Sequence, residues 1–141
     1  MLAALAEAEI AFSKGEVPVG AVIVKDGKII ALGHNMREQK QNALSHAEME
    51  AINNACKTLG SWRLDGCEMY VTLEPCPMCT GAIINSRIST LIFGAYDIKA
   101  GSVDSVINLC DYPYNHKVEI YGGIMEDRCQ EILQKFFKNL R

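Results

Sequence analysis

Four residues in two short motifs carry the side chains best suited to chemistry in this sequence. His46 and Glu48 are separated by one alanine, and Cys76 and Cys79 form a Cys-x-x-Cys pair further along the chain. One histidine and two cysteines are good ligands for Zn2+, and a zinc ion with three protein ligands keeps a fourth position open for water. The residue types therefore predict a catalytic zinc site at His46, Cys76 and Cys79.

Glu48 is expected to move protons to and from that water. Zinc lowers the pKa of a bound water to about 7, so that hydroxide is available at neutral pH. A neighbouring carboxylate can take the proton of the water, deliver it to a ring nitrogen and then protonate the departing amine. Backbone groups near Ala47 and Pro75 are candidate contacts to the edge of the base. The predicted chemistry is metal-assisted hydrolysis.

Two other interpretations of the cysteine pair are open. A structural zinc site has four protein ligands, usually in two short-spaced pairs. No second Cys-x-x-Cys or His-x-x-x-His pair occurs, so a fourth ligand would have to be a lone cysteine or histidine. A redox-active pair would leave His46 and Glu48 without a role. Three ligands beside a glutamate fit an open, catalytic site better.

Composition indicates one soluble globular domain over residues 1–141. The chain is 49% hydrophobic and 22% charged, has a net charge of −3, and has no apolar stretch long enough to span a bilayer. We find no signal peptide and expect a cytoplasmic protein that does not associate with a membrane. In that reducing setting we expect free thiols at the remaining cysteines, which are Cys56, Cys67, Cys110 and Cys129.

The hydrophobic periodicity predicts alternating helices and strands. The expected helices are residues 2–13, 46–59, 76–86 and 126–140, with a short helix within 101–109. The expected strands are residues 19–25, 28–32, 67–73, 88–93 and 117–121, the first two joined by the hairpin signal Asp26-Gly27. This order predicts an α/β fold in which a mixed five-stranded sheet lies between helices, a three-layer α/β/α arrangement.

The metal ligands are expected at the first turns of two helices. Cys76 and Cys79 are three positions apart, so their sulfurs share one face of a helix. The unpaired N–H groups and the positive end of the dipole favour thiolates there. Ser45 is the expected N-cap of the helix that begins at His46. Two helix N-termini would then converge on one metal ion.

The His-x-Glu and Pro-Cys-x-x-Cys motifs are identified as the signature of zinc deaminases that act on nucleobases. Further blocks resemble one family within that superfamily, the bacterial tRNA-specific adenosine deaminases. These blocks span essentially the whole chain and are residues 15–22 (GEVPVGAV), 33–35 (GHN), 70–87 (YVTLEPCPMCTGAIINSR), 93–97 (FGAYD), 115–119 (NHKVE) and 136–137 (FF).

This resemblance implies a cytidine deaminase-like fold and the hydrolysis of adenosine to inosine at the wobble position of a tRNA anticodon, that of an arginine tRNA. It also implies a homodimer whose active site uses residues of both subunits, with one zinc ion in each. By matching position, Asn35 and Asn115 would contact the flipped-out nucleotide and Asp97 the neighbouring loop backbone. Without the resemblance, Asn35 and Asp97 are typical turn residues.

Two other functions remain open. The zinc motif alone also suits a deaminase of a free base, nucleoside or nucleotide of the guanine, cytosine or deoxycytidylate type. The acidic net charge favours such a substrate, whereas the 115–116 block and the basic residues Lys135, Lys138 and Arg141 favour RNA. The third candidate is a zinc-stabilised binding domain without catalysis, in which Glu48 would be dispensable.

Overall fold

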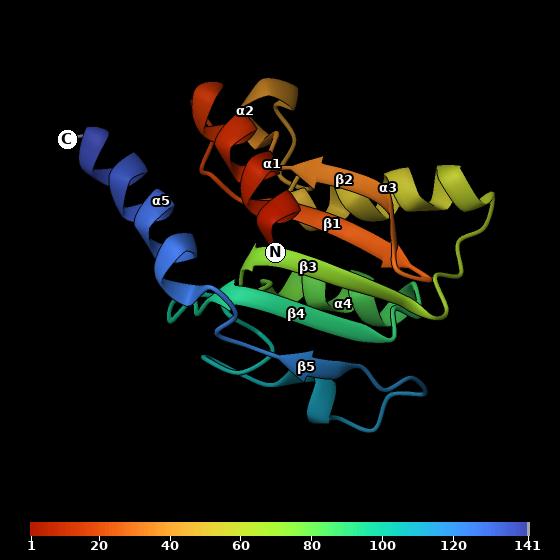
Figure 1. The fold of residues 1–141 in the computed structure, drawn as a ribbon. Coiled ribbons are helices and arrows are strands. Elements are labelled where there is room, and N and C mark those ends of the chain that lie inside the picture. The colour runs from red at the N-terminus through yellow and green to blue at the C-terminus, as the bar shows by residue number, and fades with distance from the viewer. Residues whose placement is uncertain (141) are drawn as a thin grey trace.

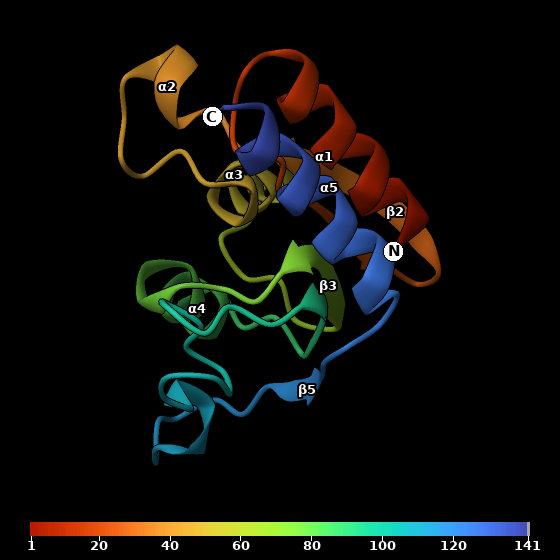
Figure 2. The same cartoon turned by 90° about the vertical axis from the view of Figure 1, so that its left-hand side faces the viewer.

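Five strands form one mixed sheet, and helices cover both of its faces (Figures 1 and 2). The computed structural model describes residues 1–140. The strands lie in the order β2-β1-β3-β4-β5, and their ranges are β1 Gly20–Lys25, β2 Lys28–His34, β3 Cys67–Leu73, β4 Thr90–Ala95 and β5 Glu119–Tyr121. The expected three-layer α/β/α architecture is confirmed.

The helices divide into two layers, one on each side of the sheet. Helices α1 and α5 pack against each other on one face, and α3 and α4 pack against each other on the opposite face (Figure 2). The helix ranges are α1 Leu2–Ser13, α2 Arg37–Lys40, α3 Ala47–Leu59, α4 Pro77–Asn85 and α5 Glu126–Asn139, with a short 3-10 helix at Leu109–Asp111. Lys135 and Lys138 lie on α5, and Arg141 lies outside the described residues.

The strand directions place three strand ends at one edge of the sheet. Strand β1 runs antiparallel to both β2 and β3, and β3 runs parallel to β4. Strands β2, β3 and β4 therefore end at the same edge, which lies on the left in Figure 1. The residues that follow these strands, and the N-termini of α3 and α4, meet there. In open α/β sheets this carboxyl edge is the usual place for a ligand site.

The hairpin predicted at Asp26-Gly27 is confirmed. Both residues have positive φ angles, 51° and 75°, as a two-residue type I′ turn requires. A glycine tolerates this conformation without strain. The turn aligns β1 with β2, which closes the antiparallel edge of the sheet.

The short helix expected within residues 101–109 is wrong, because this stretch forms turns and a 3-10 helix begins only at its end, at Leu109–Asp111. Several other element boundaries differ from the expected ones by one or two residues. The N-cap of α3 is His46, because this residue is still extended and the helix begins at Ala47; Ser45 lies one residue too early. Strand β4 begins at Thr90 because Ile88, although buried, donates its N–H to the carbonyl of Ile83 and so closes the end of α4.

Helix α2 lies within a polar segment in which the sequence pattern indicates no helix. It has one turn, and no residue of it is buried. The carboxylate of Glu16, which is buried, accepts hydrogen bonds from the N–H groups of Glu38 and Gln39. This contact comes from a residue distant in sequence, which explains why local periodicity does not reveal the helix.

The four cysteines outside the metal motif form no disulfide, as predicted, and three of them are buried. Among residues 1–140, no helix is both long enough and apolar enough to cross a membrane.

Candidate metal centre and substrate pocket

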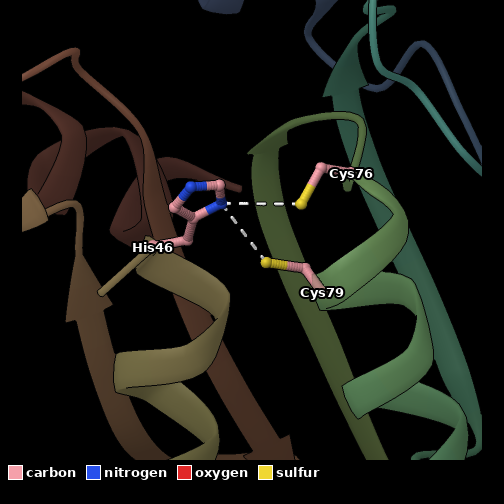
Figure 3. A group of neighbouring side chains, drawn as sticks. All are labelled: His46, Cys76 and Cys79. Carbon is pink, nitrogen blue, oxygen red and sulfur yellow. Dashed lines mark hydrogen bonds between the residues drawn. The ribbon is translucent and has the colours of Figure 1, made fainter. Parts of the chain in front are cut away.

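His46, Cys76 and Cys79 converge at the carboxyl edge of the sheet, at the start of α3 and α4 (Figure 3). The Nδ1 atom of His46 lies 3.6 Å from Sγ of Cys76 and 3.5 Å from Sγ of Cys79. A tetrahedral zinc ion bound at about 2.3 Å to sulfur and about 2.0–2.1 Å to nitrogen places those atoms about 3.6 Å apart. Both nitrogen–sulfur distances therefore already match the spacing that Zn2+ requires, and all three ligand atoms lie within 4.8 Å of one another.

The local backbone explains why these side chains are free to bind a metal. His46 and Cys76 are the N-cap residues of α3 and α4, both extended, with ψ angles of 157° and 175°. Neither side chain caps its own helix. Pro77 occupies the start of α4, where a missing N–H costs little. Cys79 follows in the first turn, so the two sulfurs share one side of α4 as predicted.

The three ligand side chains also shift one another's pKa values. Hydrogen bonds from Cys79 and His46 lower the pKa of Cys76 to about 4. The same contact with Cys76 raises the pKa of His46, and the hydrogen bond to Cys76 together with burial raises the pKa of Cys79. Without metal, these shifts favour a Cys76 thiolate beside a more basic imidazole and a thiol. A cation entering the site would find a negative ligand already formed.

Glu48 lies on the first turn of α3 and is almost completely buried, with 4% of its surface exposed. Burial raises the pKa of its carboxyl to about 7. A group with this pKa populates both protonation states near neutral pH, which is the condition for efficient proton transfer in both directions. Glu48 is thus suited to accept a proton and to return it.

A pocket with a volume of about 170 Å3 opens beside the ligand cluster. It joins residues from all three strand ends and from the first turn of α3. The residues that line it are Val17, Val19, Asn35, Arg37, His46, Ala47, Glu48, Leu73, Glu74, Cys76, Asp97 and Ala100. A small planar group in this pocket would lie against both the metal ligands and Glu48.

Three of the residues that the sequence analysis selects as candidate substrate contacts line this pocket: Asn35, Ala47 and Asp97. Asn35 and Asp97 make the local hydrogen bonds that the turn interpretation predicts. The side chain of Asn35 accepts a hydrogen bond from the N–H of Arg37, and that of Asp97 accepts from the N–H groups of Lys99 and Ala100. These hydrogen bonds fix both residues at the rim of the pocket.

Pro75 and Asn115 are placed differently from the other candidate residues. Pro75 joins β3 to Cys76, but its carbonyl oxygen accepts a hydrogen bond of 2.8 Å from the N–H of Ser102 and so serves the fold. Asn115 is exposed and does not line the pocket.

The position of Asn115 follows from the sheet. It precedes β5, whose first residue pairs with the first residue of β4. The neighbouring His116 has its Nε2 atom 2.7 Å from the carbonyl oxygen of Ile88, also before β4. Asn115 therefore lies at the amino edge, and the six residues of β4, roughly 20 Å of extended chain, separate it from the pocket edge.

Sequence reasoning missed Glu74 as a residue of the site. It directly follows β3, is 2% exposed and lines the pocket. Burial alone would raise the pKa of its carboxyl, but hydrogen bonds from Ser105, Asp97 and Asp104 outweigh this effect and lower the pKa. The sequence contains one indication of its importance, because Glu74 is a charged residue between a buried strand and the Pro-Cys motif.

The comparisons with known proteins agree with this geometry. A model of the family described as MafB19-like deaminase matches residues 1–141. The tRNA-specific adenosine deaminase of Bacillus subtilis (strain 168) is 49% identical over 142 aligned residues, which cover 100% of this chain and 88% of that protein. The tRNA-specific adenosine deaminase of Aquifex aeolicus (strain VF5) is 52% identical, with 98% of this chain and 91% of that protein covered.

A solved structure is also similar over nearly its whole length. It comes from a study of A-to-I editing by tRNA deaminases at the wobble position of transfer RNA, and it superposes with a TM-score of 0.92 at 43% identity. The match covers 94% of this chain and 97% of the other. The cytidine deaminase-like fold implied by the resemblance is confirmed.

Proposed function

Because the chain belongs to the tRNA-specific adenosine deaminases of the MafB19-like deaminase family, we propose that it hydrolyses adenosine to inosine at the wobble position of a tRNA anticodon. One observation carries this proposal beyond family membership. The buried carboxyl of Glu48, two of the metal ligands (His46 and Cys76) and two polar side chains (Asn35 and Asp97) line one pocket. The third ligand, Cys79, lies directly behind it, with its ligand atom within 4.8 Å of the other two. This arrangement brings a proton carrier, a metal site and groups for recognising a nucleotide together.

His46, Cys76 and Cys79 would hold one zinc ion per subunit, since their spacing fits tetrahedral coordination. Zinc bound there supplies the Lewis acidity that makes water a nucleophile at neutral pH. Glu48 accepts a proton from the water and holds it in a site from which solvent is largely excluded. It would donate that proton to a ring nitrogen of adenine as the oxygen of the water bonds to the adjacent carbon. It would then take the second proton from that oxygen and give it to the departing amine, which leaves as ammonia, so one carboxyl serves twice as base and twice as acid.

The substrate pocket suits a base that is taken out of a single-stranded loop. Loop bases in RNA can be splayed out and read at their edges, which a base in a duplex cannot. Asn35 offers an amide and Asp97 a carboxylate beside the pocket. These two residues are the proposed contacts to the flipped-out nucleotide and its neighbouring backbone, with the backbone of Ala47 and Pro75 near the edge of the base.

A homodimer would explain the position of Asn115. Within one chain this residue lies at the opposite edge of the sheet from the pocket. A second copy of the chain could bring its own Asn115 to this pocket, in agreement with the shared active site that the family resemblance implies. We propose a dimer of this kind, acting on an arginine tRNA in the cytoplasm.

The substrate is tested by incubating the zinc-loaded protein with an arginine anticodon stem-loop that carries a wobble adenosine. Nucleoside analysis should show inosine, and binding should weaken as salt increases, because phosphate contacts release counterions. The matched control is the same stem-loop with guanosine at the wobble position, which should remain unchanged. Turnover of free guanine, cytosine or deoxycytidylate without inosine formation in the RNA would instead assign the chain to the deaminases of small molecules.

A further inference from the structure

The buried carboxylate of Glu74 is the most extensively hydrogen-bonded acidic side chain beside the pocket. It lies between β3 and Cys76, and only 2% of it is exposed. None of the ion pairs within residues 1–140 includes it. Its partners are main-chain N–H groups and one hydroxyl, all from residues 97–105.

These hydrogen bonds hold both ends of that segment. Oε1 of Glu74 accepts from the N–H of Asp97 at 3.1 Å and from the hydroxyl of Ser105. Oε2 accepts from the N–H groups of Val103, Asp104 and Ser105, at 3.3, 2.9 and 2.9 Å. Hydrogen bonds to an ionised acceptor are about twice as strong as neutral ones. One side chain therefore replaces the secondary structure that the segment lacks.

Gly101 shows how closely the segment surrounds this carboxylate. A Cβ atom at this position would lie 2.3–2.4 Å from the carboxyl atoms of Glu74. The N–H of the next residue, Ser102, donates to the carbonyl of Pro75, which joins Glu74 to the metal ligand Cys76. The segment is thus tied to the chain immediately before the metal ligand by side-chain and main-chain contacts.

The same segment forms one wall of the pocket. Asp97 and Ala100 line it together with Glu74, and Asn35 and Glu48 line the same pocket. The N–H of Asp97 is held by Glu74, and the carboxylate of Asp97 in turn accepts from the N–H groups of Lys99 and Ala100. The conformation of this wall therefore depends on a residue that sequence reasoning did not select.

We propose that Glu74 is a positioning residue that fixes the 97–105 segment as the substrate-binding wall of the pocket. It acts on the substrate through Asp97 and Ala100, and the chemical step remains with Glu48 and the metal site. The inference rests on the proposed function for the identity of the substrate. The role of Glu74 in holding the segment rests on the hydrogen bonds alone.

The test compares Glu74→Gln with Asp104→Asn in the zinc-loaded protein. The amide of Gln has only one oxygen, and its NH2 group takes the place of the second carboxylate oxygen. The N–H and O–H donors that bind that oxygen in the wild type then lose their acceptor. We expect KM for the anticodon stem-loop to rise at least about tenfold, since charge-assisted hydrogen bonds are worth that much, while kcat changes much less and zinc content is retained. Asp104→Asn removes an exposed carboxylate from the same segment without removing its N–H, and should match the wild type.

Two further variants separate positioning from general loss of structure. Glu74→Asp keeps a carboxylate and should restore part of the lost affinity. In Gly101→Ala the added methyl group would clash with the Glu74 carboxylate and push the segment away from it. This variant should therefore raise KM in the same way as Glu74→Gln. Combining the two substitutions should raise KM little further. A Glu74→Gln protein with wild-type KM, or one that loses only kcat and zinc, would overturn the proposal.

Hydrogen exchange tests the structural part without any substrate. In Glu74→Gln the amides of Asp97, Val103, Asp104 and Ser105 should exchange faster, while amides within α4 keep their protection. Unchanged exchange in the segment would overturn the role of Glu74 even if the enzyme is active. If the wild type forms no inosine but the segment loses protection in the variant, the proposed function fails while the role of Glu74 in holding the segment stands.

Discussion

The Nδ1 atom of His46 lies 3.6 Å from the Sγ atom of Cys76, although the two residues belong to motifs far apart in the sequence. Each is the N-cap of its own helix, and each helix begins at the carboxyl edge of the sheet. The contact exists because β2 and β3 end at the same edge, and the chain enters α3 and α4 from there. A metal site is therefore built into the topology of the fold.

Zinc binding should release protons. In the metal-free site the pKa of Cys76 is lowered to about 4, whereas the pKa values of His46 and Cys79 are raised. Cys76 is then already a thiolate at neutral pH, and a metal must displace the proton of Cys79 together with any proton held by His46. Calorimetric titration with zinc in buffers of different ionisation enthalpy should show this release. Zinc affinity should rise with pH; affinity that is independent of pH would contradict the ligand assignment.

Cys79→Ser should abolish stable zinc binding. The loss should exceed the roughly 10–100-fold that is typical when only a residue supporting a ligand is changed. The matched control is Cys56→Ser, which alters a half-buried thiol outside the cluster and should retain one zinc ion per chain. Metal analysis after dialysis distinguishes the two variants. Equal zinc content in both would rule out Cys79 as a ligand.

Glu48→Gln should stabilise the metal-free protein at neutral pH. Burial raises the folded-state pKa of Glu48 to about 7 from an ordinary 4.5, so between these values the folded state binds a proton that the unfolded state has released. The stability that the protonated carboxyl contributes is therefore lost as pH rises through this window, and the loss is complete above it. The advantage of the Gln variant should grow with pH from about 4.5 to about 7 and then stay constant.

Urea unfolding of the chelator-treated proteins at a series of pH values checks this dependence. Glu119→Gln, which changes an exposed carboxylate on β5, provides the control and should show no such growth. The Glu48→Gln variant could instead show no gain in unfolding free energy at neutral pH, or a gain that shrinks as pH rises. Either result would contradict the raised pKa of the buried Glu48 carboxyl.

Gly33→Ala should destabilise the fold at the start of α3. A Cβ atom at Gly33 would lie 2.5 Å from the carbonyl oxygen of Ala47 and 2.5 Å from the nitrogen of Ala51, both main-chain atoms that cannot move independently of the helix. We expect a loss of about 1–3 kcal/mol, as in other overpacked interiors, and weaker zinc binding because His46 precedes this turn.

Gly81→Ala is the matched substitution for this prediction. Gly81 lies in α4 with nothing within 4 Å of an added Cβ, so alanine should stabilise the protein by up to about 1 kcal/mol. Thermal unfolding of both variants provides the measurement. A neutral Gly33→Ala would mean that α3 does not pack as closely on β2 as the structure shows.

Local sequence patterns predict most of the fold and the metal site because the relevant signals are local. The Asp26-Gly27 turn, the proline at the start of α4 and the spacing of Cys76 and Cys79 each act within a few residues. The ends of helices and strands are less well predicted where a residue is buried but does not pair with a neighbouring strand. Ile88 is as apolar as a strand residue, yet its N–H completes the end of α4.

Long-range contacts explain what the sequence pattern does not predict. The hydrogen-bond donors to Glu74 lie 23 to 31 positions further along the chain. The two donors to Glu16, which belong to α2, lie 22 and 23 positions further along. No periodicity marks such pairs. The same limit applies to Asn115, because only the pairing of β4 with β5 reveals that it lies at the far edge of the sheet.

Inosine formation by the wild type and by Glu48→Ala, each with its zinc content measured in the same sample, tests the central claim most directly. We predict one zinc ion per chain in both proteins, inosine in the wobble-adenosine stem-loop with the wild type, and a rate at least about 100-fold lower with the variant, as loss of general acid–base catalysis requires. Equal rates at equal zinc content would contradict the assignment of Glu48 as the group that moves the protons.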